Sequence, residues 1–246
     1  MGMKMKDRLV EILLGNQPSI FLYGSVVHND FKLGWSDIDI ICLCETPLLP
    51  AQANALLHLR AEHPRFRLFE GGILSLDGFL HSTPDTVVYW GTSGQRITDH
   101  YNLCPFGKMD LIDNGRLLYG QDCRHLIPYP IRAEIVAAIK NHYETIRQHG
   151  KAGSGWFLDI ARCLYTLRTN KLIPKTKAGA WAMDQNLCPD PSIMERVLEI
   201  RHHPLLKTSP QVKQWEDTLA PHIQQFAHVL AQELKNHIPE RVLTNA

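Results

Sequence analysis

Two acidic residues interrupt a hydrophobic run near the start of the chain. The stretch SDIDIICLC, residues 36 to 44, otherwise has the apolar, β-branched composition of a buried strand. It nevertheless contains Asp37 and Asp39, and a carboxylate in such surroundings costs several kcal/mol unless a partner compensates its charge. This feature constrains the fold more than any other, because the strand must carry both acids together with whatever neutralises them.

The spacing of these acids predicts a divalent metal site. In an extended chain, side chains two residues apart leave the same face about 6 to 7 Å from each other. Asp37 and Asp39 can therefore bind one cation. Mg²⁺ prefers carboxylate oxygens and accepts substrate phosphate oxygens as further ligands. We expect Asp37 and Asp39 to hold Mg²⁺ in a site that transfers a phosphorus-containing group.

A Gly-Ser turn upstream fits the same chemistry. The short apolar run SIFLY, residues 19 to 23, is expected to be a strand that ends at Gly24-Ser25. Glycine lets the backbone approach a phosphate closely, and the turn amides and the serine hydroxyl can donate hydrogen bonds to it.

Strand, Gly24-Ser25, spacer and Ser36-Asp37-Ile38-Asp39 together resemble the signature of the polymerase-β-like nucleotidyltransferase superfamily. Asn29 stands where relatives often carry glycine, and asparagine tolerates a left-handed backbone. The resemblance implies an α+β protein, in which an N-terminal α/β nucleotidyltransferase domain with a mixed sheet precedes a C-terminal all-helical domain. It also implies Mg²⁺ as metal and ATP as co-substrate, with Gly24, Ser25 and Ser36 contacting the nucleotide.

Members of this superfamily usually carry a third acid on a neighbouring strand. Glu70 is the leading candidate, because it lies in the predicted strand 65–76 and sheet pairing can bring it beside Asp37 and Asp39. It would act as a third metal ligand, as the general base for an acceptor hydroxyl, or as both. Asp77, in the expected turn LDGF, is a weaker substitute.

The second half carries a narrower resemblance. The stretch LYTLRTNKLIPKTKAGAWAMDQ, residues 164 to 185, is similar to the helical domain of aminoglycoside adenylyltransferases of the streptomycin/spectinomycin type. LYGS, SDIDI and EGGILSLDGF in the first half match that group too. The resemblance implies that Asp37 and Asp39 hold Mg²⁺ and that Glu70 takes the proton from the drug hydroxyl. It makes Lys171, Lys175 and Arg201 candidates for contacting the triphosphate.

One departure bears on the acceptor. Relatives commonly carry acids that meet a cationic drug where this chain has Thr176 and Ala180. Asp159, Asp184 and Glu195 are the acids that could replace them. We expect the transferase chemistry to be retained more securely than the antibiotic specificity.

The pattern of the whole chain predicts two domains, 1–127 and 128–246. Strands and helices alternate in the first, whereas helical spacing recurs at 131–150, 155–172, 191–203 and 209–238 in the second. The net charge of +1 argues against a long nucleic-acid partner. The spacing of the six cysteines suggests no disulfide framework. No stretch is apolar enough to cross a membrane, and we expect a cytoplasmic protein.

The expected function is Mg²⁺-dependent transfer of AMP from ATP to a hydroxyl of a small molecule, an aminoglycoside-type antibiotic, which would confer antibiotic resistance. Two alternatives stay open at this point. One is a toxin-like nucleotidyltransferase that adenylylates a protein or tRNA. The other is a non-catalytic nucleotide-binding module, against which the intact acid pair argues.

Overall fold

The computed structural model describes residues 4–237, and its internal contacts divide the chain into two units. The first contains the chain up to Phe31 together with Ser36–Tyr129, and the second contains Lys32–Trp35 together with the chain from Pro130 onward. A mixed sheet lies in the first unit and helices dominate the second, so the predicted α+β class is confirmed.

The first unit is built on a six-stranded sheet with the order β5-β4-β3-β2-β1-β6 within residues 4–237. Strands β2 and β3 are parallel, and every other neighbouring pair is antiparallel. The strands are β1 (Ser19–Tyr23), β2 (Ile38–Cys44), β3 (Phe69–Ser75), β4 (Val87–Gly91), β5 (Gly94–Thr98) and β6 (Arg116–Tyr119).

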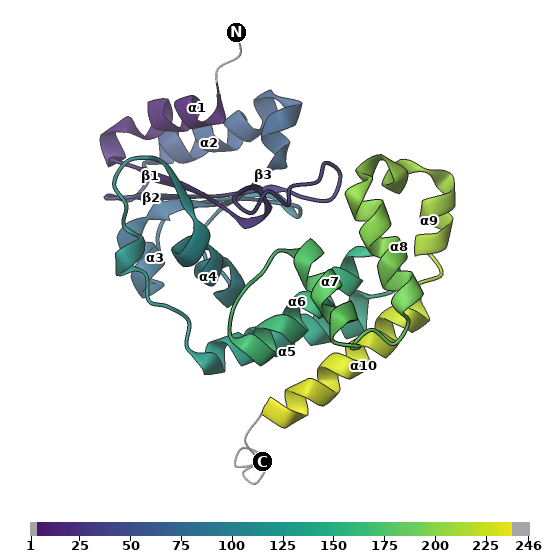
Figure 1. Ribbon diagram of the computed structural model, residues 1–246. Coiled ribbons are helices and arrows are strands. Elements are labelled where there is room, and N and C mark those ends of the chain that lie inside the picture. The colour runs from purple at the N-terminus through teal and green to yellow at the C-terminus, as the bar shows by residue number, and fades with distance from the viewer. Residues whose placement is uncertain (1–3, 238–246) are drawn as a thin grey trace. The chain divides into compact units, whose positions relative to one another are not determined.

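Helices cover both faces of this sheet (Figure 1). On one face, α1 (Met5–Leu13) and α2 (Pro50–Glu62) pack with Ile40 and Cys42 of β2 in one hydrophobic core. On the other face lies a second core, which holds Ile41 of β2 and residues of α3 (Leu76–His81) and α4 (Pro105–Asn114). The alternation of side chains along β2 thus fills two cores and places Asp39 on the α3/α4 face.

Three local expectations need correction. LDGF was expected to be a turn but begins α3, because the Ser75 hydroxyl accepts a hydrogen bond from the amide of Gly78 at 2.9 Å and caps the helix. The first residues of the expected strand 65–76 form a 3₁₀ helix, η3 (Pro64–Leu68). Strand β5 was not predicted, because its residues are mostly exposed and carry little apolar alternation.

A close approach of two backbones fixes the pairing of β3 with β2. Gly71 has φ +147°, and a Cβ built there would lie 1.7 Å from the carbonyl oxygen of Ile40. Only glycine leaves room for this approach. In the resulting parallel register, Asp39 lies beside Glu70.

The second unit is helical. Its helices are α5 (Arg132–His149), α6 (Gly155–Thr169), α7 (Lys175–Asp184), α8 (Pro191–His202), α9 (Pro210–Glu216) and α10 (Ala220–His237). The expected helical region 209–238 is divided between α9 and α10, and its last residue lies outside the described residues.

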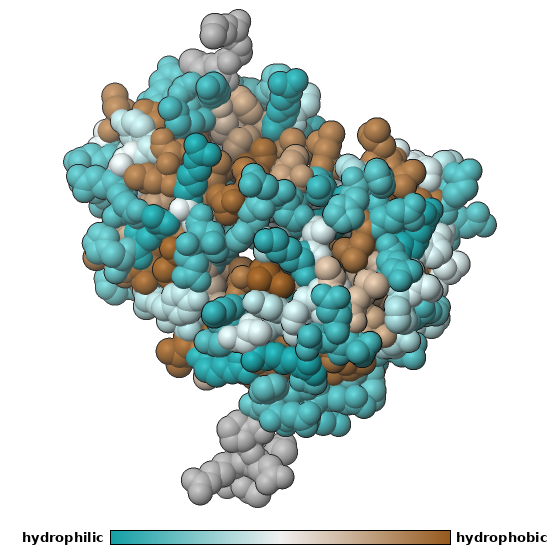
Figure 2. Space-filling view, in the orientation of Figure 1, coloured by the Kyte–Doolittle hydropathy of each residue, from teal (hydrophilic) through white to brown (hydrophobic). Residues whose placement is uncertain are grey.

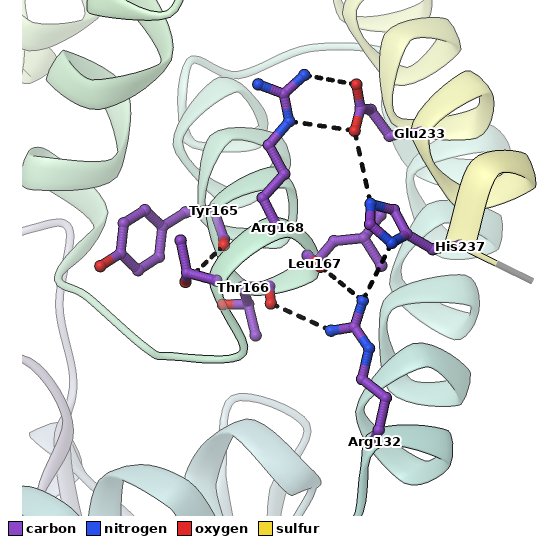
Figure 3. A network of polar contacts seen from close by, with 8 residues as sticks. Arg132, Tyr165, Thr166, Leu167, Arg168, Glu233 and His237 are labelled. Atoms are coloured by element: carbon purple, nitrogen blue, oxygen red, sulfur yellow. Dashed lines mark hydrogen bonds and ion pairs between the residues drawn. The ribbon is translucent and has the colours of Figure 1, made fainter.

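A polar network ties α10 to α6 and α5 (Figure 3). The Arg168 guanidinium donates to both carboxylate oxygens of Glu233, at 2.5 and 3.1 Å. Arg132 donates to the carbonyl oxygen of Leu167 at 2.6 Å, at the end of α6. Bidentate contacts between charged groups have a defined geometry, so this network adds directional contacts to the apolar packing of α10.

No helix in residues 4–237 is long and apolar enough to cross a membrane. Hydrophilic residues cover much of the face seen in Figure 2, and the hydrophobic residues form separate patches between them. All six cysteines are free thiols.

Candidate functional site

The structure brings the three predicted acids together at the N-terminal ends of the central strands β2 and β3. Asp39 lies within β2, Asp37 directly precedes this strand, and Glu70 is the register partner of Asp39 on β3. All three are partly buried. Asp77, the weaker candidate, is instead exposed at the start of α3, where its carboxylate lies 3.0 Å from Nδ1 of His81.

The acids are crowded enough to perturb each other. Burial and the nearby charge of Asp37 raise the pKa of Glu70, and the guanidinium of Arg60 only partly opposes this. A raised carboxyl pKa beside like charge is characteristic of sites that hold a cation or move a proton. The arrangement therefore suits both roles predicted for Glu70.

Gly24 is required by the position of Asp39. The residue has φ +72°, and a Cβ built on it would lie 1.9 Å from Oδ2 of Asp39. A side chain at this position would displace the carboxylate. The glycine of the turn thus makes room for one of the acids.

The amide of Gly24 has a partner within the protein. It donates to Oδ2 of Asp110 on α4 at 2.5 Å, and a contact of Gly24 with the nucleotide stays a prediction. The hydroxyl of Ser25 donates to the carbonyl oxygen of Asp37 at 3.4 Å. Asn29 has φ +55°, in the left-handed region expected for it.

Asp110 is a site residue that the sequence did not reveal. Its side chain is almost fully buried, and Oδ1 lies 2.5 Å from Nε2 of His28 and accepts a hydrogen bond from Nδ2 of Asn114 at 3.1 Å. The carboxylate of Asp110 thus holds the backbone of the Gly24-Ser25 turn in place by a hydrogen bond. An acid within the apolar stretch KMDLI of α4 was the available signal.

The donor set at the start of β2 and β3 fits Mg²⁺. Carboxylate oxygens are its preferred protein ligands, and the ion commonly takes only one or two carboxylates besides substrate phosphates and water. Asp37 and Asp39 supply two, and a cation would relieve the repulsion that raises the pKa of Glu70. Within residues 4–237, no three His, Cys, Asp or Glu side chains form a metal-binding group by themselves. A ligand role for Glu70 stays a prediction.

The predicted cations of the second unit have different surroundings. Nζ of Lys175 lies 2.9 Å from Oδ1 of Asp159. Nε of Arg201, which is buried, donates to the hydroxyl of Thr176 at 2.7 Å. Lys171 is exposed at the start of the loop between α6 and α7.

A further cation, Lys207, joins this group. Its ammonium lies 4.0 Å from the ring centre of Trp35, and the guanidinium of Arg201 lies 5.5 Å from the same ring. Burial lowers the pKa of Lys207, and the charges of Arg201 and Lys175 lower it further, against an opposing effect of Glu216. Concentrated positive charge of this kind favours an anionic ligand.

The acids considered as replacements for an acceptor contact are not equivalent. Burial raises the pKa of Asp159, but Lys175, Arg162 and His142 outweigh it, and the net pKa lies below its usual value. Its charge is thus already matched by cations. Asp184 and Glu195 are exposed, on α7 and α8.

Comparison with known proteins agrees with this picture. Residues 127–233 match the family model described as aminoglycoside adenylyltransferase, C-terminal domain. The fold is similar to the crystal structure of spectinomycin adenyltransferase AAD(9) from Enterococcus faecialis with ATP and spectinomycin. The TM-score is 0.68 at 18% sequence identity, over 92% of this chain and 96% of that one. Among curated protein sequences, no significant match was found.

The fold is thus similar to that of a spectinomycin adenyltransferase, and the acids at the start of β2 and β3 form a candidate nucleotidyltransferase site. Together with the match of the second half, they place the chain close to the aminoglycoside adenylyltransferases, as the sequence motifs predicted.

Proposed function

We propose that the chain transfers AMP from ATP to a hydroxyl group of an aminoglycoside-type antibiotic. The observation that carries this proposal is the register of β2 and β3, which puts Glu70 beside Asp39 and within the field of Asp37. A metal-binding acid pair and a carboxylate with a raised pKa are the parts that such a transfer requires. The AAD(9) fold and the matching second half support the same reaction class.

In this reaction Glu70 accepts the proton of the acceptor hydroxyl. The hydroxyl oxygen then forms a bond to the α-phosphorus, the bond from that phosphorus to the bridging oxygen of the β-phosphate breaks, and pyrophosphate leaves. Asp37 and Asp39 would hold Mg²⁺, which supplies charge neutralisation for the phosphate oxygens. Gly24 leaves room for the carboxylate of Asp39, and the carboxylate of Asp110 accepts a hydrogen bond from the Gly24 amide. Positioning and charge account for most of the rate.

The cations of the second unit are the proposed triphosphate ligands. Lys171, Lys175 and Arg201 follow from the sequence, and Lys207 is added by its place beside Trp35. We expect Lys207→Gln to raise the KM for ATP about tenfold, the loss of roughly one charged contact, and to change kcat less. Steady-state kinetics with varied ATP measures this. Lys213→Gln, at an exposed lysine on α9, is the control, and an equal effect in both variants would contradict the assignment.

The decisive test of the activity is pyrophosphate release. Protein, ATP and Mg²⁺ should release pyrophosphate when spectinomycin or streptomycin is added, and the drug should gain the mass of one adenylyl group, which is AMP less one water. Removing Mg²⁺ with a chelator should abolish turnover, because the acids need a cation to bind the triphosphate. Turnover with total tRNA or protein in place of the drug would instead identify a macromolecular acceptor. ATP binding without pyrophosphate release for any acceptor would indicate a binding module.

A further inference from the structure

Two tyrosines lie next to Glu70 on the face of the sheet that carries Asp39. Tyr89 of β4 pairs with Gly72, which is two residues beyond Glu70 on β3. The neighbours of Tyr89, Val88 and Trp90, pack into the opposite core with α1 and α2, so Tyr89 points to the face of the acids.

Two glycines make room for these rings. A Cβ built on Gly91 would lie 2.0 Å from Oη of Tyr89. The phenol therefore lies over Gly91, which follows Trp90 and reaches the level of Glu70 on β3. A Cβ on Gly72 would lie 2.7 Å from the ring of Tyr101. Gly91 and Gly72 thus leave space that the tyrosine side chains occupy, just as Gly24 leaves space for the carboxylate of Asp39.

The second tyrosine, Tyr101, lies between Tyr89 and the residues around Asp39. Tyr101 shares a hydrogen bond with Tyr23, which is the register partner of Asp39 on β1. Burial raises the pKa of Tyr101, and the charge of Asp39 contributes to the same shift, so these groups are close. The ring centres of Tyr89 and Tyr101 are 6.4 Å apart. Tyr89 and Tyr101 are both partly buried, and neither is fully enclosed.

An arginine lies at the far end of this surface. Arg96 of β5 pairs with Tyr89, and its guanidinium lies 4.2 Å from the centre of the Tyr89 ring. The side chain is exposed, and no acid is paired with Arg96 among the ion pairs of residues 4–237. Because arginine stays charged at all working pH values, this end of the surface is permanently cationic.

We propose that Tyr89 and Tyr101 form the surface on which the acceptor's ring lies, and that Arg96 selects against acceptors with many positive charges. The proposal rests on the proposed function. Tyrosine offers an apolar ring face and a hydrogen-bonding hydroxyl, which suits a cyclic polyol or sugar ring. A hydroxyl on such a ring is then next to Glu70, while cations close to the ring meet Arg96 and lose affinity.

Gly91→Ala is the sharpest variant, because it moves Tyr89 without changing its chemistry. The three atoms nearest to the added methyl, at 2.0 to 2.7 Å, all belong to the Tyr89 side chain, so we expect this ring to turn away. We expect the KM for spectinomycin to rise about tenfold, the loss expected for one stacked ring, with an unchanged KM for ATP. Tyr89→Leu should give the same rise, and Tyr89→Phe should restore most of the affinity.

A double variant separates contact from general damage. If Gly91→Ala acts by displacing Tyr89, adding Tyr89→Leu should cost nothing further, whereas unrelated effects would add. Arg96→Gln should lower the KM for the more highly charged streptomycin about threefold and change the KM for spectinomycin less. Arg116→Gln and Tyr119→Leu, on β6 at the other edge of the sheet, are matched controls that should leave these values unchanged.

The outcomes distinguish this inference from the proposed function. Calorimetric binding of both drugs, with a non-hydrolysable ATP analogue present, is measured beside pyrophosphate release. Additive effects of Gly91→Ala and Tyr89→Leu, or an unchanged preference in Arg96→Gln, would overturn the inference even if the enzyme turns over. Absence of binding of either drug would overturn it as well. Drug binding that follows the predicted variant pattern without any pyrophosphate release would overturn only the proposed reaction.

Discussion

Asparagine in place of Asp39 is expected to slow AMP transfer by about 10³-fold. The substitution keeps the shape of the side chain against Gly24 but removes a charge that the proposed Mg²⁺ needs. Lewis-acid charge stabilisation contributes several kcal/mol to such transfers, and roughly 1.4 kcal/mol corresponds to each factor of ten. Pyrophosphate release under saturating ATP and acceptor measures the loss.

The fold should survive this change, because a repulsive charge is removed from a crowded site. The melting temperature of Asp39→Asn should be equal to or above that of the parent. Glu45→Gln is the control, since Glu45 is exposed directly after the other end of β2. Parental turnover in Asp39→Asn would show that the metal assignment is wrong.

Glutamine in place of Glu70 is expected to lower kcat by about 10² to 10⁴-fold, the usual contribution of a general base. The amide cannot accept the proton of the acceptor hydroxyl, although its size and neighbours are unchanged. In the parent enzyme, kcat/KM should rise with pH through the raised pKa of Glu70, because only the carboxylate is active. The variant should lose this acidic limb of the pH profile.

Asp77→Asn serves as the matched control for Glu70→Gln. Asp77 was the alternative acid, and it is exposed and paired with His81. We expect this variant to keep the parental rate and pH profile. If Glu70→Gln keeps the parental pH dependence of kcat/KM and Asp77→Asn loses it, then Asp77 and not Glu70 is the general base.

The same carboxyl makes a prediction about stability. Burial and Asp37 raise the folded-state pKa of Glu70 above its unfolded value, so the folded state binds the proton more tightly. The contribution of protonated Glu70 to the free energy of unfolding is complete below the pKa of the unfolded state. It is lost as the pH rises through the pKa of the folded state. Glu70→Gln should therefore melt at the same or a higher temperature than the parent at neutral pH, while being nearly inactive. A clearly lower melting temperature would argue for a structural role.

Much of the acid site was predictable because its information is local in sequence. The alternation around Asp37 and Asp39 defines a strand, and a strand-helix-strand pattern favours parallel pairing, which brings Glu70 close. Asn29 shows the same locality, since its backbone conformation follows from its own side chain.

What was missed depends on tertiary neighbours. The sequence does not show what Asp110 and Lys207 contact; only the fold places one beside Gly24 and the other beside Trp35. The Tyr89 ring is functional in our interpretation only because Gly91 lies beneath it. Strand β5 has no apolar pattern, because it is an exposed edge strand held by pairing to β4.

The contact between Gly71 and the carbonyl of Ile40 has an evolutionary consequence. Main-chain atoms set the alignment of the acids at this point, and main-chain atoms do not differ between sequences. Side chains in the surrounding cores are then free to diverge, provided that a residue without a Cβ stays at this point. Two proteins at 18% identity can accordingly keep one architecture. In a mutational library, position 71 should therefore be among the least tolerant in the chain, although its side chain does no chemistry.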